Sequence, residues 1–95
     1  MKTTWRVYVL SAVCEDGFRC FYVGYTGLPV RERVAQHKSG KKFCPGCKPR
    51  HYFRASGIRL LDTLGPFTTR ARAKVCEREV AEGLRRQGNV VQGGH

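Results

Sequence analysis

The sequence predicts a small α+β domain with three strands and two main helices, and two observations lead to this fold class. Bulky residues alternate along two segments on either side of Asp16-Gly17, a pair that is typical of a β-hairpin turn. Apolar residues recur at helical spacing in two later segments, and each of these segments begins with residues that favour a helix start. A chain of 95 residues has room for one modest core, so we expect residues 1–95 to form a single domain.

The predicted elements follow one another along the chain with short connections. Strands are expected at Trp5–Val13, Arg19–Tyr25 and Ile58–Leu64. One helix is expected to open at Leu28-Pro29 and to include His37, and a short one to cover Arg50–Ala55. Gly65-Pro66 is expected to stop the third strand. The last helix is expected to begin after Thr68 or Thr69, to reach about Gln87 and to end at Gly88, with an extended or frayed tail after it.

The register of the hairpin decides whether two tyrosines share a face. A two-residue turn at Asp16-Gly17 would put Tyr8 and Tyr22 on opposite faces of the sheet. A three-residue loop, or one bulge, would pair Cys14 with Cys20 and bring both tyrosines to the same face. We expect the second arrangement.

The first helix carries a cation and an imidazole on its apolar side. At about 100° per residue, Val30, Arg33, Val34 and His37 fall on one face, whereas surface helices normally turn their charges away from the core. Two interpretations stay open. Arg33 and His37 snorkel at the edge of the core, or they line a pocket for an anion together with Tyr22.

The last helix carries a carboxylate inside its apolar stripe. Glu77 falls within this stripe, whereas Glu79 and Glu82 project to solvent; the stripe itself comprises Ala73, Cys76, Val80 and Leu84. A buried carboxylate must be paired, protonated or bound to a cation. A salt bridge to an arginine and a role as a Mg²⁺ ligand are both compatible with this position, because Mg²⁺ is commonly held by one or two carboxylates plus phosphate oxygens.

The charge balance points to a polyanionic partner. The chain has 18 Lys+Arg against 7 Asp+Glu, a formal net charge of +11, and nucleic acid is the leading candidate. An anionic membrane surface is the competing partner, but no stretch combines a basic face with a bulky apolar one, so we expect no membrane partner. Half of the basic residues lie between positions 31 and 59, around Tyr52 and Phe53, which could stack on bases. In this region, phosphate contacts are expected from Arg31, Lys38, Lys41, Lys42, Lys48, Arg50 and Arg54.

The cysteine content and the N-terminus predict a cytoplasmic protein. Five cysteines are an odd number, and the start of the chain lacks a convincing export signal, so we expect reduced thiols. A Cys14–Cys20 disulfide across the hairpin is the alternative. No segment approaches the ~20 apolar residues that a membrane-spanning helix needs.

The order of these residues resembles the GIY-YIG nuclease superfamily. The first motif corresponds to Arg6-Val7-Tyr8 and the second to Tyr22-Val23-Gly24, the latter being the closer match. The superfamily's arginine and histidine correspond to Arg33 and His37, its glutamate to Glu77 within Ala73-Lys74-Val75-Cys76-Glu77, and a supporting polar residue to Asn89. The resemblance extends from Trp5 to about Val91.

The resemblance implies a small three-stranded antiparallel sheet flanked by helices, and hydrolysis of a phosphodiester with one Mg²⁺ or Mn²⁺ ion. It implies that Tyr8 acts as a general base and that Tyr22 positions the water or the phosphate. A tyrosine has a pKa of ~10, so nearby positive charge from Arg33, His37 and the metal would have to assist. Arg33 would neutralise charge on the phosphoryl oxygens, and Glu77 would hold the ion.

The remaining site residues have supporting or open roles. His37 would be a phosphate donor, a proton shuttle or a hydrogen-bond partner of a tyrosine. Gly24 would provide room at the start of the helix, and Tyr25 and Asn89 are assigned supporting positions.

Two features depart from the superfamily. The first motif lacks its glycine, and the loop at about positions 39–49 carries Cys44-Pro45-Gly46-Cys47. Zinc could be bound there by Cys44, Cys47 and His51 with His37 or another cysteine, but a single CxxC is weak support for a zinc site.

Three hypotheses follow for the function. The first is a metal-dependent endonuclease acting on DNA, on branched, damaged or single-stranded forms, in repair or recombination. The second is a non-catalytic nucleic-acid-binding module of the same fold. The third is a small zinc-stabilised interaction domain. Each leaves room for a protein partner.

Overall fold

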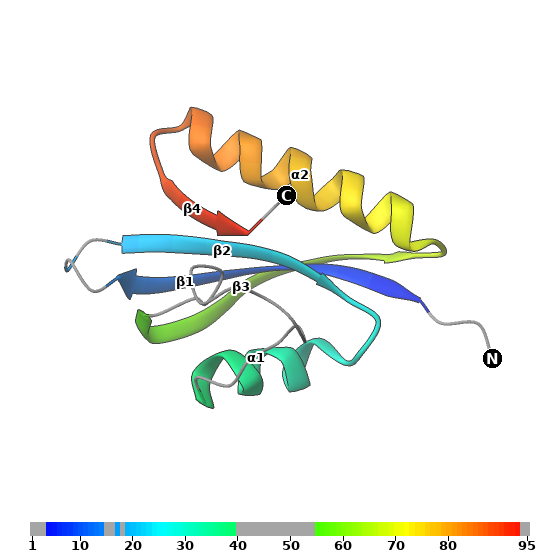
Figure 1. Ribbon diagram of the computed structural model, residues 1–95, viewed down its shortest axis with the longest axis horizontal. Coiled ribbons are helices and arrows are strands. Elements are labelled where there is room, and N and C mark those ends of the chain that lie inside the picture. Colours follow the sequence, from blue (N-terminus) through cyan, green and yellow to red (C-terminus); the bar gives the residue numbers. More distant parts are fainter. Residues whose placement is uncertain (1–3, 15–16, 18, 40–54, 94–95) are drawn as a thin grey trace.

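Four strands form one mixed sheet with a helix on each face (Figure 1). The computed structural model describes residues 4–14, 17, 19–39 and 55–93. Its strands are β1 (Trp5–Cys14), β2 (Arg19–Thr26), β3 (Ala55–Phe67) and β4 (Val90–Gly93), in the sheet order β3-β1-β2-β4. Its helices are α1 (Val30–Ser39) and α2 (Arg70–Arg86). The fold is therefore α+β, as predicted.

The sheet differs from the prediction at its fourth strand. The antiparallel pairs β1–β2 and β1–β3 agree with the expected three-stranded sheet. β4 adds to the free side of β2, and it runs parallel to β2. A parallel neighbour needs a long crossover connection, which α1, β3 and α2 supply between them. The tail that was expected to be extended or frayed thus includes a strand from Val90 to Gly93.

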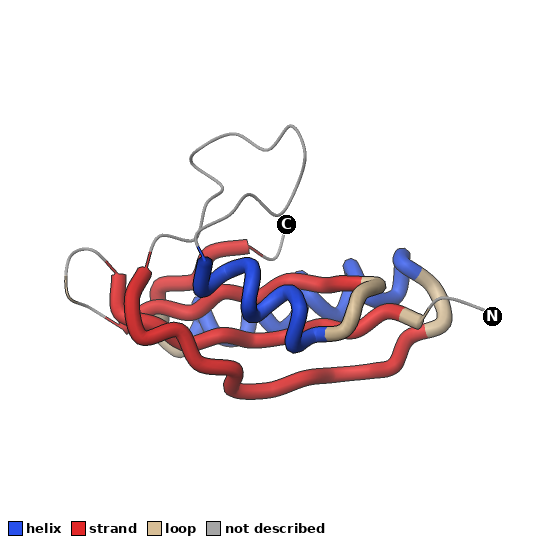
Figure 2. The backbone as a smooth tube through the Cα atoms, turned by 90° about the horizontal axis from the view of Figure 1, so that it is seen from below, coloured by secondary structure: helices blue, strands red, loops and turns tan. Residues whose placement is uncertain are grey.

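Alternation along β1 and β2 divides the core into two layers. Tyr8, Leu10 and Cys20 belong to the layer beneath α1, packed with Val34. The strand residues that point to the opposite face pack under α2. This second layer includes Val7, Val9 and Val23 from the strands and Ala73 and Ala81 from α2. Figure 2, which views the molecule from below, shows α1 lying across one face of the sheet with α2 behind it. The alternation of bulky residues predicted for both strands is therefore confirmed.

The hairpin register is a third arrangement, different from both of the expected alternatives. Cys20 pairs with Ala12, and Tyr22 pairs with Leu10, so the expected Cys14–Cys20 pair is wrong. Tyr8 pairs with Gly24, two residues from Tyr22, and both tyrosines therefore face α1 as expected.

Local capping explains where α2 begins and ends. The side chain of Thr69, at the N-cap of α2, accepts a hydrogen bond from the Arg72 backbone N–H at 3.2 Å. The helix ends at a Gln87 cap, and Gly88 follows with φ of 90°, a conformation that favours glycine. Both ends agree with the prediction.

The third strand, in contrast, passes through Gly65-Pro66 to Phe67 instead of stopping there. Proline is tolerated because β3 is an edge strand.

Two further expectations concern the thiols and the membrane. Cys20 is disulfide-bonded, so the prediction of reduced thiols throughout is wrong at this residue; among the cysteines with described side chains, Cys76 is free. No helix within the described ranges is long and apolar enough to cross a bilayer.

The predicted short helix over Arg50–Ala55 lies almost wholly outside the described residues, and Ala55 itself begins β3.

Candidate active site

Two tyrosines on adjacent strands form the floor of the site. The rings of Tyr8 and Tyr22 stack with 6.1 Å between centroids and an interplanar angle of 27°. Gly24 lies directly across from Tyr8. A Cβ atom on Gly24 would be 2.7 Å from the Tyr8 hydroxyl oxygen and 2.9 Å from Cε1 of Tyr22. The expected packing role of Gly24 therefore concerns the two phenol rings, rather than the start of the helix.

α1 brings His37 onto this floor. The His37 side chain is 2 % exposed, and its Nε2 lies 3.0 Å from the Tyr8 hydroxyl in a buried hydrogen bond. Its ring centroid is 4.5 Å from that of Tyr22 and 5.7 Å from that of Tyr8. The helix face predicted to carry Val30, Val34 and His37 is therefore the buried face.

Arg33 lies one turn before His37, and its charge shifts the pKa values of Tyr8, Tyr22 and His37. Its positive charge lowers the pKa values of Tyr8 and Tyr22, and a hydrogen bond between Arg33 and Tyr8 acts in the same direction on Tyr8. Its Nη1 donates to Oε1 of Gln36 at 3.0 Å. Gln36 was not among the predicted site residues; it is half-buried and orients the guanidinium. The spacing of three residues was the available signal, because such pairs are neighbours on a helix.

Burial decides the protonation of the site. It raises the pKa of Tyr8 and raises that of Tyr22 strongly, and it outweighs the opposing effect of Arg33 on both phenols. Burial also lowers the pKa of His37 from 6.5 to about 4, and the charge of Arg33 adds to this effect. His37 is therefore neutral at pH 7. The expectation that it supplies positive charge to the tyrosines is wrong.

Glu77 joins the site electrostatically from the other side of the sheet. It is 5 % exposed and lies in the buried stripe of α2, with Ala73 and Ala81. Its negative charge raises the pKa values of both Tyr8 and Tyr22, so the carboxylate is close enough to act on both phenols. The five side chains singled out in the sequence thus belong to one electrostatic unit built from β1, β2, α1 and α2: Tyr8, Tyr22, Arg33, His37 and Glu77.

The described donor set suits a metal ion that arrives with its own ligands. No group of three or more His, Cys, Asp or Glu side chains gathers anywhere in residues 4–14, 17, 19–39 and 55–93. Among the described buried side chains, Glu77 is the carboxylate. Mg²⁺ is commonly bound by one carboxylate together with phosphate oxygens and water. It does not need a site in which every ligand comes from the protein. A Mg²⁺ or Mn²⁺ ion at Glu77 would therefore need phosphate oxygens and water as its remaining ligands.

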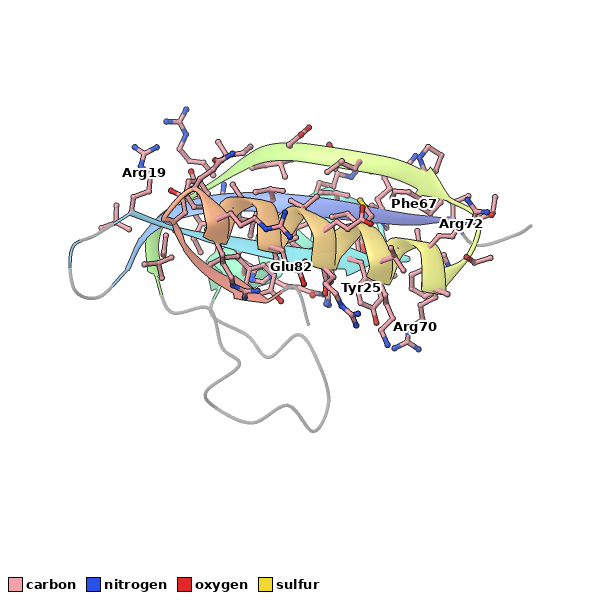
Figure 3. All side chains as sticks on the ribbon, turned by 90° about the horizontal axis from the view of Figure 1, so that it is seen from above. Arg19, Tyr25, Phe67, Arg70, Arg72 and Glu82 are labelled. Carbon is pink, nitrogen blue, oxygen red and sulfur yellow. The ribbon has the colours of Figure 1, made fainter. Side chains whose placement is uncertain are left out.

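Two predicted supporting residues lie elsewhere. Tyr25 belongs to the α2 side of the sheet, where its hydroxyl accepts a hydrogen bond from Nε of Arg70 at 3.0 Å. Figure 3 shows Tyr25 and Arg70 together along one side of α2. Asn89 donates from Nδ2 to the Leu84 carbonyl at 3.1 Å and so caps the end of α2. Both side chains have these local structural roles.

The predicted nucleic-acid contacts fall into two groups. Arg31 and Lys38 are exposed on α1. The other basic residues of this set lie outside the described residues, as do all three residues of the predicted zinc site: Lys41, Lys42, Lys48, Arg50, Arg54, Cys44, Cys47 and His51. Zinc binding at this loop stays a prediction.

Comparisons with known proteins add no relative: no protein-family model, no curated protein and no solved structure matches this chain.

Proposed function

We propose that this protein is a divalent-metal-dependent endonuclease that hydrolyses phosphodiester bonds in DNA. The observation that carries the proposal is the convergence of Tyr8, Tyr22, Arg33, His37 and Glu77, which are far apart in the sequence, on one electrostatic unit. A net charge of +11 supports a polyanionic substrate. The resemblance of the same five residues to the GIY-YIG superfamily agrees with this chemistry.

The geometry suggests a route for the proton of the attacking water. A phenol with a raised pKa keeps its proton at pH 7, so Tyr8 can act as a base only if that proton leaves as another arrives. Neutral His37 has an acceptor nitrogen 3.0 Å from the Tyr8 hydroxyl. Tyr8 would take a proton from water while passing its own to Nε2 of His37. This requires the His37 tautomer that carries its proton on Nδ1.

The other groups of the site would bind and stabilise the phosphate. Arg33 offers guanidinium donors to the phosphoryl oxygens, where negative charge develops during attack. Tyr22 would orient the water or the phosphate through its hydroxyl. A Mg²⁺ or Mn²⁺ ion on Glu77 would supply Lewis-acid polarisation of the phosphate.

One observation favours a second candidate, a non-catalytic nucleic-acid-binding module. Tyr8 is 0 % exposed, and His37 and Glu77 are nearly as buried, so an attacking water needs an opening that a purely structural cluster would not. An interaction domain stabilised by zinc depends on the loop outside the described residues. A protein partner and a cytoplasmic location both stay predictions.

Incubation with DNA in the presence and absence of metal separates the two candidates. Purified protein is mixed with plasmid, branched and single-stranded DNA, with Mg²⁺, with Mn²⁺ or with EDTA. A nuclease cuts at least one of these forms in a metal-dependent manner, and Arg33→Ala and Glu77→Ala abolish cutting while largely retaining binding. Binding of every form without metal-dependent cutting would instead establish the module.

A further inference from the structure

The exposed surface of α2 is divided into two sides with different charge. At 100° per residue, Arg70, Lys74, Arg78 and Arg85 fall within an arc of about 80°. All four are exposed, and we call them the basic row. The neighbouring arc carries Arg72, Glu79, Glu82 and Arg86, two cations and two carboxylates, and we call it the mixed side. Within it, Arg86 lies 3.9 Å from Glu82. Positive charge on α2 is therefore concentrated on one side.

Hydrogen bonds at both ends locate the basic row over the β2–β4 edge of the sheet. Nε of Arg70 donates to the Tyr25 hydroxyl on β2 at 3.0 Å, with its guanidinium carbon 5.7 Å from the centre of the tyrosine ring. Nη2 of Arg85 donates to the Val91 carbonyl on β4 at 3.2 Å. Figure 3 shows Arg70 on this side of the helix and Arg72 on the other, beside Phe67. The row is thus about 22 Å long and follows this edge.

The row also passes the carboxylate of the candidate site. Glu77 lies between Lys74 and Arg78 in the sequence, and on the helix it lies within the buried stripe, about 20° around the axis from Arg70. Cations spaced by four residues are about 6 Å apart along the axis, which gives a linear track of charge instead of a single anion pocket. A linear track fits a linear polyanion.

The apolar residues argue against a membrane as that polyanion. Val75 is the exposed large hydrophobic residue of α2, at 56 %. It is five residues from Arg70, about 140° around the helix, and so it lies on the mixed side. A membrane-binding helix would need bulky apolar residues beside its cations.

We propose that the basic row binds the sugar–phosphate backbone of a nucleic-acid strand and leads it along the β2–β4 edge towards Glu77. The choice of nucleic acid as the ligand rests on the proposed function, but the row can bind a strand whether or not the protein cuts it. The row lies on α2, whereas the exposed Arg31 and Lys38 lie on α1 at the opposite face of the sheet (Figure 1), so these two sets of cations offer separate contacts to a strand.

The salt dependence of binding tests the row. Fluorescence anisotropy with a labelled single strand of about 20 nucleotides, in EDTA and over a series of NaCl concentrations, gives the slope of log K against log salt concentration. The row variant is Lys74→Ala/Arg78→Ala. The matched control is Arg72→Ala/Arg86→Ala, which removes the same two charges from the mixed side. Thermal melting followed by circular dichroism verifies that both variants are folded.

We expect the row variant to reduce the magnitude of the slope by about 1.4, from about 0.7 per lost phosphate contact, and the control to leave it unchanged. An equal change in both variants, no change in either, or no binding by the wild type would overturn the proposal. So would a loss of binding to phosphatidylserine vesicles with the oligonucleotide slope intact. EDTA prevents metal-dependent cutting, so this assay measures binding alone. A failure of the basic row to bind DNA can therefore be distinguished from a failure of the protein to cut DNA.

Discussion

Replacement of Gly24 by alanine tests the packing at the floor of the site. The added Cβ would lie 2.7 Å from the Tyr8 hydroxyl oxygen, 2.8 Å from Cζ of Tyr8 and 2.9 Å from Cε1 of Tyr22. Such contacts require one of the rings to move. Tyr8 is 0 % exposed and is hydrogen-bonded to His37, so it has no solvent to move into. Overpacking of this kind costs about 1–3 kcal/mol.

A matched glycine on α2 provides the control. A Cβ atom added to Gly83 would have no neighbouring atom within 4 Å, and Gly83 does not have positive φ. Gly83→Ala should therefore raise the free energy of unfolding by about 0.5–1 kcal/mol through helix propensity. The two alanine variants should then differ by about 1.5–4 kcal/mol.

Thermal and urea denaturation measure this difference. For a domain of this size, a loss of about 2 kcal/mol lowers Tm by roughly 8–16 °C. Gly24→Ala should also disturb the Tyr8–His37 hydrogen bond, visible as a change in the His37 ring resonances by NMR. A Gly24→Ala protein as stable as the wild type, with unchanged His37 resonances, would refute the packing described for Tyr8 and Tyr22.

Three further predictions concern single interactions. His37 has a pKa of about 4 when folded and near 6.5 when unfolded, so the unfolded chain binds the extra proton between these values. The stability that His37 contributes is complete above pH 6.5 and is lost as pH falls towards 4, by at most about 3 kcal/mol; urea titrations of wild type and His37→Gln should show a smaller loss in the variant, and equal losses would contradict the assignment. Tyr8→Phe removes the hydroxyl bonded to His37 and should lower the unfolding free energy by about 1–3 kcal/mol in the same assay at pH 7, so an unchanged value would argue against that bond. Thr69→Ala should lower the free energy of unfolding by about 1 kcal/mol because the N-cap of α2 is lost, whereas Thr68→Ala should change it little. A larger loss for Thr68→Ala in thermal melts would contradict Thr69 as the cap.

The site could be predicted from the sequence to the extent that it depends on side-chain periodicity. The predicted pair Cys14–Cys20 and the observed pair Ala12–Cys20 differ by two residues on one strand. Because the side-chain period of a strand is also two, the wrong register still placed Tyr8 and Tyr22 on the correct face. The α1 face with Arg33 and His37 was predictable for the same reason, from the helical period.

The parts that were missed depend on long-range context. Val90 to Gly93 is too short to signal a strand, and it pairs with β2 only because α2 returns the chain to that edge. Gly65-Pro66 is a normal strand stop, but an edge strand tolerates it. The neutral state of His37 results from burial between α1 and the sheet, which no local pattern encodes.

The cleavage rate of one glutamate variant measured against its neighbour tests the central claim most directly. Glu77 is buried and acts on both phenols, whereas Glu79 is exposed two residues later on the same helix. If Glu77 holds the metal of a phosphodiesterase, Glu77→Gln should reduce single-turnover cleavage with Mg²⁺ by about 100-fold or more, and Glu79→Gln should leave it near the wild-type rate. Equal rates in the two variants, with both proteins folded, would contradict the account.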